Sequence, residues 1–372
     1  MVDVIVVGGG LAGLVSSILL SRSGLSVTLI EKNRYPFHRV CGEYISNEAI
    51  PFLEKHDLFP SEFDPTAIDE LELSATNGNS FREKLDLGGF GISRYHLDYW
   101  LSQKAKDAHV TLMENTTADS IQFKEECFSV VLKSGETLQS KIVIGAHGKR
   151  SKLDKSLERS FIVKKSPYVA VKHHIKAELP HNRISLHNFH GGYCGVSMIE
   201  NERFNLCYMA HRDVFKQHGN VDKFEKEVLC KNPRLKSVLD QAEFLFEKPL
   251  VINEINFDKQ EPVHNHILMC GDAAGMITPL CGNGMAMAMH SAKTLSELII
   301  ESMQSQKFDR DTLEEKYAVA WRSQFATRLW SGRKIQNLFG TGSGSAIGVF
   351  LGKAIKPVSR FLISKTHGQP FS

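Results

Sequence analysis

The chain has 372 residues, of which 42% are hydrophobic, and its 45 Lys and Arg against 42 Asp and Glu give a formal net charge of +3. This length predicts two to three domains with sizeable cores, and the mild charge gives no reason to expect a nucleic-acid partner. The seven cysteines are dispersed without a C-x-x-C pair, and no uncharged apolar run reaches the roughly 18 residues of a transmembrane helix, so we expect reduced thiols and a cytoplasmic protein.

The sequence opens with a strand–turn–helix pattern. Val2–Val7 is a short apolar run that predicts a buried strand, and a helical pattern from Leu11 to about Ser23 follows it. Between the two lies a G-x-G-x-x-G series formed by Gly8, Gly10 and Gly13. In such a unit the first glycine makes a tight turn, the second lets the backbone approach a pyrophosphate, and the third lets helix and strand pack closely. Because this unit occupies the start of the sequence, we expect no cleavable signal peptide.

A second strand and an acidic residue complete the pattern. Val27–Ile30 predicts the strand, and Glu31 stands at its end, eighteen residues past Gly13. That is close to the spacing of about 20 residues at which an acid accepts a ribose hydroxyl. The unit therefore predicts a dinucleotide site, whose further candidates are the first helical residues and the neighbour of the acid: Leu11, Ala12 and Lys32.

Two basic residues further along are candidates for the same site. Arg39 lies in a loop that also carries Cys41 and Gly42, and Arg94 lies near the start of a predicted helix. In one interpretation Arg39 reaches back to the nucleotide and places Cys41 and Gly42 beside its reactive end, while Arg94 binds phosphate. In the other interpretation both arginines are solvated surface cations. Ser46–Leu58 predicts a capped helix after the loop.

The middle of the chain predicts an inserted sheet. Two strands flank an Asn77-Gly78-Asn79 turn, and four more candidates lie between residues 160 and 256: Val169–Ile175, Ile184–Phe189, Tyr193–Ile199 and Phe204–Met209. We expect this antiparallel sheet to bind an apolar or aromatic substrate through Tyr193, Val196 and Met198. Neighbouring histidines in these strands point to opposite faces and lack completing ligands, so we expect no metal site.

The first unit returns near residue 266. His266–Cys270 predicts a strand, which is broken at Gly271-Asp272, and Met285–Ile300 predicts a helix after the loop Pro279–Gly284. We therefore expect an α/β fold with a Rossmann-like domain in residues 1–70, 91–160 and 255–335, and an α+β substrate domain in residues 71–90 and 161–254. Residues 336–372 predict an amphipathic helical tail that packs on the body or, alternatively, makes a peripheral membrane contact.

Three separated motifs together resemble one family. These motifs, GGGLAG with Glu31, IVIGAHGKRSKL and GDAAGMITPLCGNG, resemble the FAD-dependent oxidoreductases of the p-hydroxybenzoate hydroxylase fold. Within that fold, CGE, GYCGVS and PLCGNGMAMAMHSA are similar to the geranylgeranyl reductase-like branch. The resemblance covers residues 1 to about 305 and implies FAD as the cofactor.

The resemblance assigns roles to individual residues. It implies that the three glycines hold the FAD pyrophosphate, that Glu31 holds the adenosine ribose, and that Asp272 accepts a ribityl hydroxyl. Further FAD contacts would come from the two arginines, from Cys41 and Gly42, from Gly148 and Gly271, and from the loop before the predicted helix: Pro279, Gly282, Asn283, Gly284 and Met285. Catalysis would occur beside Cys41, Pro279 and Gly282. The positive end of the helix that begins near Asn283 would stabilise anionic reduced flavin.

Two departures from the family pattern limit the functional prediction. His147-Gly148 replaces the usual Asp-Gly, so the electron donor stays open between NAD(P)H and another reductant, and the Trp-containing signature of flavin halogenases is not visible. The family prior favours a flavin monooxygenase that hydroxylates or epoxidises a hydrophobic small molecule. The alternatives are a carbon–carbon double-bond reductase and a prenyl or lipid carrier that has lost the flavin.

Overall fold

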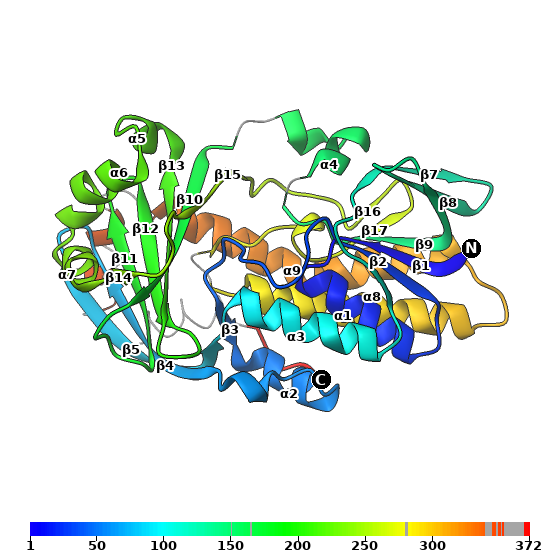
Figure 1. Ribbon diagram of the computed structural model, residues 1–372, viewed down its shortest axis with the longest axis horizontal. Coiled ribbons are helices and arrows are strands. Elements are labelled where there is room, and N and C mark those ends of the chain that lie inside the picture. Colours follow the sequence, from blue (N-terminus) through cyan, green and yellow to red (C-terminus); the bar gives the residue numbers. More distant parts are fainter. Residues whose placement is uncertain are drawn as a thin grey trace.

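Two sheet-based units lie side by side in the computed structural model (Figure 1). The structure describes residues 1–149, 151–163, 166–279, 282–338, 344–346, 349–350, 352 and 368–372. The first unit is drawn on the right of Figure 1, and the second, with its tall sheet, on the left.

The first unit is built on a mostly parallel sheet with the order β16-β17-β9-β1-β2-β6. Its central strand β1, Val2–Val7, pairs in parallel with β2 and β9, because a run of Val and Ile suits a strand buried on both faces. A hairpin of β7 and β8 extends the sheet from β9. The other strands are β2 Val27–Ile30, β6 Thr111–Met113, β7 Ala118–Lys124, β8 Cys127–Leu132, β9 Thr137–Gly145, β16 Val263–His264 and β17 Ile267–Met269.

Helices cover this sheet and build most of the core. The contacts of α1 are with α3 and α8, and α8 in turn contacts α9. Figure 1 shows α1, α3 and α8 below the sheet. The helical segments of this unit are α1 Leu11–Arg22, η1 Asn47–Ala49, α2 Ile50–Lys55, η2 Ser61–Phe63, α3 Arg94–Asp107, α4 Lys152–Ser156, η3 Ser160–Val163, η5 Gly271–Ala273, α8 Gly284–Gln304 and α9 Arg310–Leu338.

The second unit is a mixed, mainly antiparallel sheet with the order β14-β10-β13-β12-β11-β4-β5-β3, and β15 also pairs with β10. One face packs on the short helices α6 and α7 to form a separate core. The strands are β3 Tyr44–Ser46, β4 Thr66–Ser74, β5 Ser80–Gly91, β10 Tyr168–Lys176, β11 Arg183–Phe189, β12 Gly192–Met198, β13 Phe204–His211, β14 Glu243–Phe244 and β15 Leu250–Ile255. The helical segments are α5 Arg212–Lys216, α6 Val221–Glu227, η4 Leu229–Lys231 and α7 Pro233–Gln241.

The structure confirms the α/β class with an inserted sheet and changes some predicted bounds. Strand β3 and the start of β4 belong to the second sheet, so this unit draws on residues before 71 that the sequence analysis gave to the first unit. The predicted helix Ser46–Leu58 is a 3-10 turn followed by the shorter α2. Within the described ranges, no helix is long and apolar enough to cross a membrane, and no group of three or more His, Cys, Asp or Glu side chains could hold a metal ion.

Most of the predicted amphipathic tail, residues 336–372, lies outside the described residues. Two of its described parts pack on the body. Val349 is buried against Leu73 of the second sheet. Phe371 stacks on His290 of α8, with ring centroids 4.2 Å apart, and also contacts Phe52 of α2.

Candidate functional site

The glycine turn has an open position at the start of α1. A Cβ at Gly8, whose φ is +109°, would lie 2.4 Å from the carbonyl oxygen of Ala146, and a Cβ at Gly13 would lie 1.9 Å from that of Gly8. Packing inside the chain therefore requires glycine at these two positions. A Cβ at Gly10 would meet only the Arg94 guanidinium, at 3.8 Å. The space at Gly10 lies beside the free N–H groups of a helix amino terminus, where an anion binds well.

Glu31 is saturated with hydrogen bonds from its own chain. One carboxylate oxygen accepts from the Gly9 backbone N–H at 2.9 Å and from Arg39 at 3.1 Å. The other accepts from the backbone and side-chain nitrogens of Asn33, both at 3.0 Å. Because the carboxylate is only 3% exposed, it shapes the glycine turn, and a ribose hydroxyl would have to share or replace one of these donors.

The two arginines are joined by a buried carboxylate. Asp98 of α3 is fully buried and accepts from Arg39 Nε at 2.9 Å and from Arg94 Nε at 2.7 Å. Burial alone would lower the pKa of Arg94, yet the Asp98 carboxylate raises it above its ordinary value. Neither arginine is a plainly solvated cation, since their side chains are 26% and 12% exposed. Together with Glu31, these residues form an alternating row of charges that ends at the open position beside Gly10.

Cys41 and Gly42 lie at the end of this row. The Cys41 side chain lies near the Arg94 guanidinium and interacts with it electrostatically. The side-chain amide of Asn205, on β13, donates to the carbonyl oxygens of Cys41 and Gly42 at 3.2 and 2.8 Å. A Cβ at Gly42 would meet no atom within 4 Å. The loop is thus held from the second sheet, while its other side is open.

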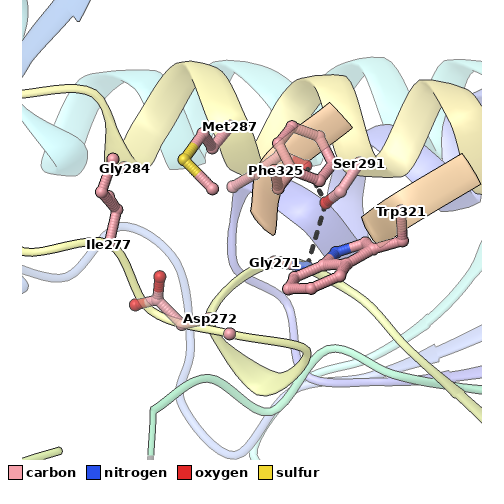
Figure 2. A pocket seen from close by; sticks show the side chains of 10 residues that line it. Gly271, Asp272, Ile277, Gly284, Met287, Ser291, Trp321 and Phe325 are labelled. Carbon is pink, nitrogen blue, oxygen red and sulfur yellow. Dashed lines mark hydrogen bonds between the residues drawn. The ribbon is translucent and has the colours of Figure 1, made fainter. Parts of the chain in front are cut away.

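Asp272 forms the opposite end of the site. It lies in the turn η5, and Figure 2 shows it across from the start of α8 in a pocket that Trp321 and Phe325 also line. Among the residues that the structure describes, no group donates a hydrogen bond to its carboxylate. Burial raises the pKa of Asp272, although Lys149 and Arg94 act in the opposite direction. An unpartnered carboxylate of this kind is suited to accept from a ligand hydroxyl.

Neighbouring groups fix the turn that carries Asp272. The N–H of Gly271 donates to the Ser291 hydroxyl of α8 at 3.0 Å, which is the dashed line in Figure 2. Arg159 donates to the carbonyl oxygen of Ala273 at 2.9 Å and to Asp154 at 3.0 Å. Asp154 in turn pairs with His147 Nε2 at 2.9 Å. The family motif has an acid at the position of His147. In this chain the nearby acid is Asp154, seven residues later, which pairs with Arg159 and so supports the turn of Asp272.

The remaining predicted cofactor residues divide between the site and the core. Gly282, with φ +63°, lies beside the Tyr44 ring, and Pro279 is exposed, but the two residues between them lie outside the described part of the chain. Asn283 immediately precedes α8 and donates to the buried Glu48 at 3.2 Å. Gly148 faces open space and Lys32 is exposed, while three others are buried in the core of the first unit: Leu11, Ala12 and Met285. Gly284 is the first residue of α8.

The structure does not bring the three predicted substrate residues together. Tyr193 faces the first unit and packs with Met209 and Met276. Val196 and Met198 lie on the opposite face of β12, in the core formed with the short helices. Side chains alternate along a strand, so residues at odd and even positions of β12 cannot share one pocket. Val196 and Met198 therefore cannot line one pocket together with Tyr193, and a substrate contact of Tyr193 stays a prediction.

Sequence reasoning missed four buried titratable residues that organise the site. Asp98 could have been found as the partner of Arg94 at helical i,i+4 spacing. Glu43 was visible only as the last letter of the CGE motif. Its partners Lys172 and His174 come from a strand about 130 residues away, and no local pattern relates such positions.

The family model described as "FAD binding domain" matches residues 1–322. Among curated proteins, conditioned medium factor receptor 1 of Dictyostelium discoideum is 24% identical over 363 residues, with 87% of this chain and 68% of that protein covered. Digeranylgeranylglycerophospholipid reductase of Methanosarcina acetivorans is 26% identical over 337 residues, with coverages of 86% and 80%. The solved structure of the flavin-dependent brominase Bmp2 gives a TM-score of 0.79 at 18% identity, with 100% of this chain and 94% of that chain covered. Pseudomonas aeruginosa PqsL with 2-aminobenzoylacetate gives 0.72 at 19% identity, with coverages of 94% and 99%.

Proposed function

Because the chain belongs to the FAD-binding-domain family and is an FAD-dependent oxidoreductase, we propose that it reduces carbon–carbon double bonds of a prenyl-type hydrophobic substrate. Two observations together support FAD as the cofactor. Among the described residues, no side chain fills the open space beside Gly10, and no group donates a hydrogen bond to the Asp272 carboxylate. We take the two as opposite ends of one site.

The residues present fit FAD. The Gly10 turn and Arg94 would hold the pyrophosphate, Asp272 would accept from the ribityl chain, and the amino terminus of α8 would face the flavin ring. Bound FAD supplies hydride-transfer chemistry. The chain contributes orientation and a closed surrounding. We assign Cys41 as the candidate proton donor because its side chain lies against the Arg94 guanidinium.

An apolar cluster at the junction of the two units supports a hydrophobic substrate. Ala170, Tyr193 and Met209 point from the second sheet toward Met276, which follows the Asp272 turn, and Val40, which precedes Cys41. Both units thus present apolar surface to the same place. A prenyl chain is a suitable ligand for such a lining, because it is long, apolar and unsaturated.

The choice of double-bond reduction rests on the relatives. Several curated proteins named digeranylgeranylglycerophospholipid reductase match 85–90% of this chain at 24–26% identity. The sequence analysis ranked hydroxylation first from the composition of the wider family. The solved structure of PqsL, described as a probable FAD-dependent monooxygenase, shares only the fold at 18% identity, so hydroxylation becomes the alternative outcome of the test.

The test is a single-turnover reaction. The FAD-loaded protein is reduced chemically and mixed with a digeranylgeranyl lipid without oxygen, and the product is analysed by mass spectrometry. We expect a product that has gained H₂ at a double bond. A product that appears only with oxygen and carries label from ¹⁸O₂ contradicts reduction and supports hydroxylation. NADH and NADPH are then compared as reductants, because His147 stands in the place of the usual acid.

A further inference from the structure

Strand β10 carries two neighbouring histidines that each contact a buried carboxylate, on opposite faces of the second sheet. His174 Nε2 lies 2.7 Å from Glu43 on the side of the first unit. His173 Nε2 lies 2.9 Å from Glu225 on the side of the short helices. Because side chains alternate along a strand, two adjacent residues reach two different environments. One pair touches the segment that carries Cys41, and the other belongs to a separate core.

Glu43 is the centre of the first group. It is fully buried, and its φ of +53° is unusual for a residue with a side chain. Its carboxylate accepts from the backbone N–H of Arg94 at 2.7 Å and from the ammonium group of the fully buried Lys172. Lys172 also donates to the carbonyl oxygen of Arg39 at 3.0 Å. Burial opposes ionisation of Glu43, yet Lys172 and then His174 lower its pKa below the ordinary value, so it stays charged.

This geometry ties three segments to one carboxylate. They are the loop of Arg39 to Glu43, the first turn of α3, and strand β10. The loop has few other constraints near its tip, since Gly42 faces open space on one side and is held on the other by the amide of Asn205. Asn205 lies directly opposite His174 in the pairing of β10 and β13. Lys172 and His174, which bind Glu43, and the amide of Asn205, which binds Gly42, therefore hold the loop from neighbouring positions of the second sheet.

We infer that Glu43 is a positioning residue, which sets the Cys41–Gly42 segment against the flavin by tying it to Lys172 and His174 of the second sheet. The inference rests on the proposed flavin site and extends it. The same carboxylate fixes the backbone of Arg94, whose side chain points to the open position at Gly10. Loss of Glu43 therefore disturbs both the cysteine segment and the phosphate-facing arginine, although Glu43 itself touches neither flavin nor substrate.

The chain offers a matched control. Glu225 is also buried and also accepts from a histidine of β10, and it accepts from the Tyr208 hydroxyl at 3.0 Å. Its surroundings are the core on the far face of the sheet. Glu225→Gln and Glu43→Gln thus make the same chemical change in buried carboxylates that each contact a histidine of β10. They differ in whether the carboxylate contacts the proposed flavin segment.

The experiment measures the dissociation constant of FAD and the melting temperature for five proteins. They are the wild type, Glu43→Gln, Glu225→Gln, Asn205→Ala and the double variant Glu43→Gln/Lys172→Met. The double variant removes both buried charges together, so it avoids the unpaired lysine that Glu43→Gln leaves and is expected to keep a melting temperature near that of the wild type. Asn205→Ala removes the amide that holds the same segment without introducing an unpaired charge. FAD binding is followed by titration of the stripped protein, with flavin fluorescence as a second readout of the ring environment.

We expect Glu43→Gln to raise the FAD dissociation constant by about tenfold or more and to change the fluorescence of the bound flavin, while Glu225→Gln lowers the melting temperature and leaves both flavin readouts unchanged. The double variant should recover stability without recovering FAD affinity, and Asn205→Ala should weaken FAD in the same direction. Equal effects of Glu43→Gln and Glu225→Gln on FAD, or recovery of affinity together with stability in the double variant, overturn the positioning role. If the wild type itself binds no FAD, the proposed function fails first and the inference falls with it.

Discussion

The two ends of the proposed flavin site are built in different ways. At the nucleotide end, Glu31, Arg39, Asp98 and Arg94 satisfy one another through hydrogen bonds of 2.7–3.1 Å before any ligand arrives. At the flavin end, Asp272 has a fixed backbone and a carboxylate with no donor among the described residues. The nucleotide end is therefore preorganised by the fold, whereas the flavin end keeps an unsatisfied group for the ligand.

This difference has an energetic meaning. Charges that pair within the chain stabilise the folded protein, because breaking such a buried network leaves a group without its partner. A carboxylate that waits for a ligand costs stability until the ligand binds. Substitutions in the paired charges of the nucleotide end should therefore act mainly on folding, and substitutions at the Asp272 carboxylate mainly on FAD binding. The following predictions test that separation.

The largest expected effect is at Asp98. Asp98→Asn removes the buried charge between Arg39 and Arg94, and we expect it to lower the free energy of unfolding by about 3–5 kcal/mol, since it leaves two arginines without their anion. Chemical denaturation measures this loss. Asp57→Asn is the control, because Asp57 pairs with Lys104 of the same helix α3 but is 81% exposed, and it should cost less than about 1 kcal/mol. Similar losses for the two variants contradict a special role for the buried network.

A second expected effect is the pH dependence of the nucleotide end. Glu200, in the turn between β12 and β13, accepts from the Ser93 backbone N–H at 2.7 Å and contacts His96 at 2.6 Å, so it holds the start of α3. Burial would raise the pKa of Glu200, but the hydrogen bonds from His96 and Ser93 lower it to about 2, from an ordinary value of 4.5. A depressed acid pKa contributes stability above the unfolded value and loses it as the pH falls toward the folded one.

The contribution of Glu200 is on the order of 3 kcal/mol at neutral pH. We therefore expect the stability difference between wild type and Glu200→Gln to shrink from about pH 6 to about pH 3. Denaturation curves of both proteins across this range measure the difference. A gap that stays constant with pH would show that the carboxylate is not ionised against these donors in the folded protein.

The smallest expected effect is at Asp272, and it has the opposite sign. Burial raises the pKa of Asp272, so its ionised form destabilises the protein without FAD, and this cost is relieved as the pH falls through the raised value. Asp272→Asn should thus stabilise the FAD-free protein slightly, by less than about 1 kcal/mol, while it weakens FAD binding. Melting temperatures with and without FAD measure both changes. A variant that is less stable without FAD would mean that Asp272 has a structural partner.

The sequence predicted the parts of this protein that depend on local pattern. The glycine series, Glu31, the hairpin at Asn77-Gly78 and the turn at Asp272 all lie in short segments whose spacing has a direct physical reason, and the structure has these elements where they were expected. The first sheet could be derived because parallel strands buried on both faces are uniform apolar runs.

The parts that the sequence did not predict depend on distant contacts. The cluster of Glu43, Lys172 and His174 joins residues about 130 positions apart. The sequence cannot show that these side chains meet, because the contact forms only when β10 packs against the loop. The error at Val196 and Met198 has another cause, since an apolar strand between two cores gives no sign of which face meets the substrate. The assignment of β3 and the start of β4 to the second sheet likewise required knowledge of strand pairing.

The most direct test of the account is the FAD occupancy of Gly10→Val. A Cβ at this position lies 3.8 Å from the nearest chain atom, the Arg94 guanidinium, and the φ of −83° at Gly10 suits residues with side chains. The account predicts a folded protein with a melting temperature near that of the FAD-free wild type, and with no bound FAD by absorbance. A folded Gly10→Val protein that retains the flavin content of the wild type would contradict the assignment of this turn to the pyrophosphate.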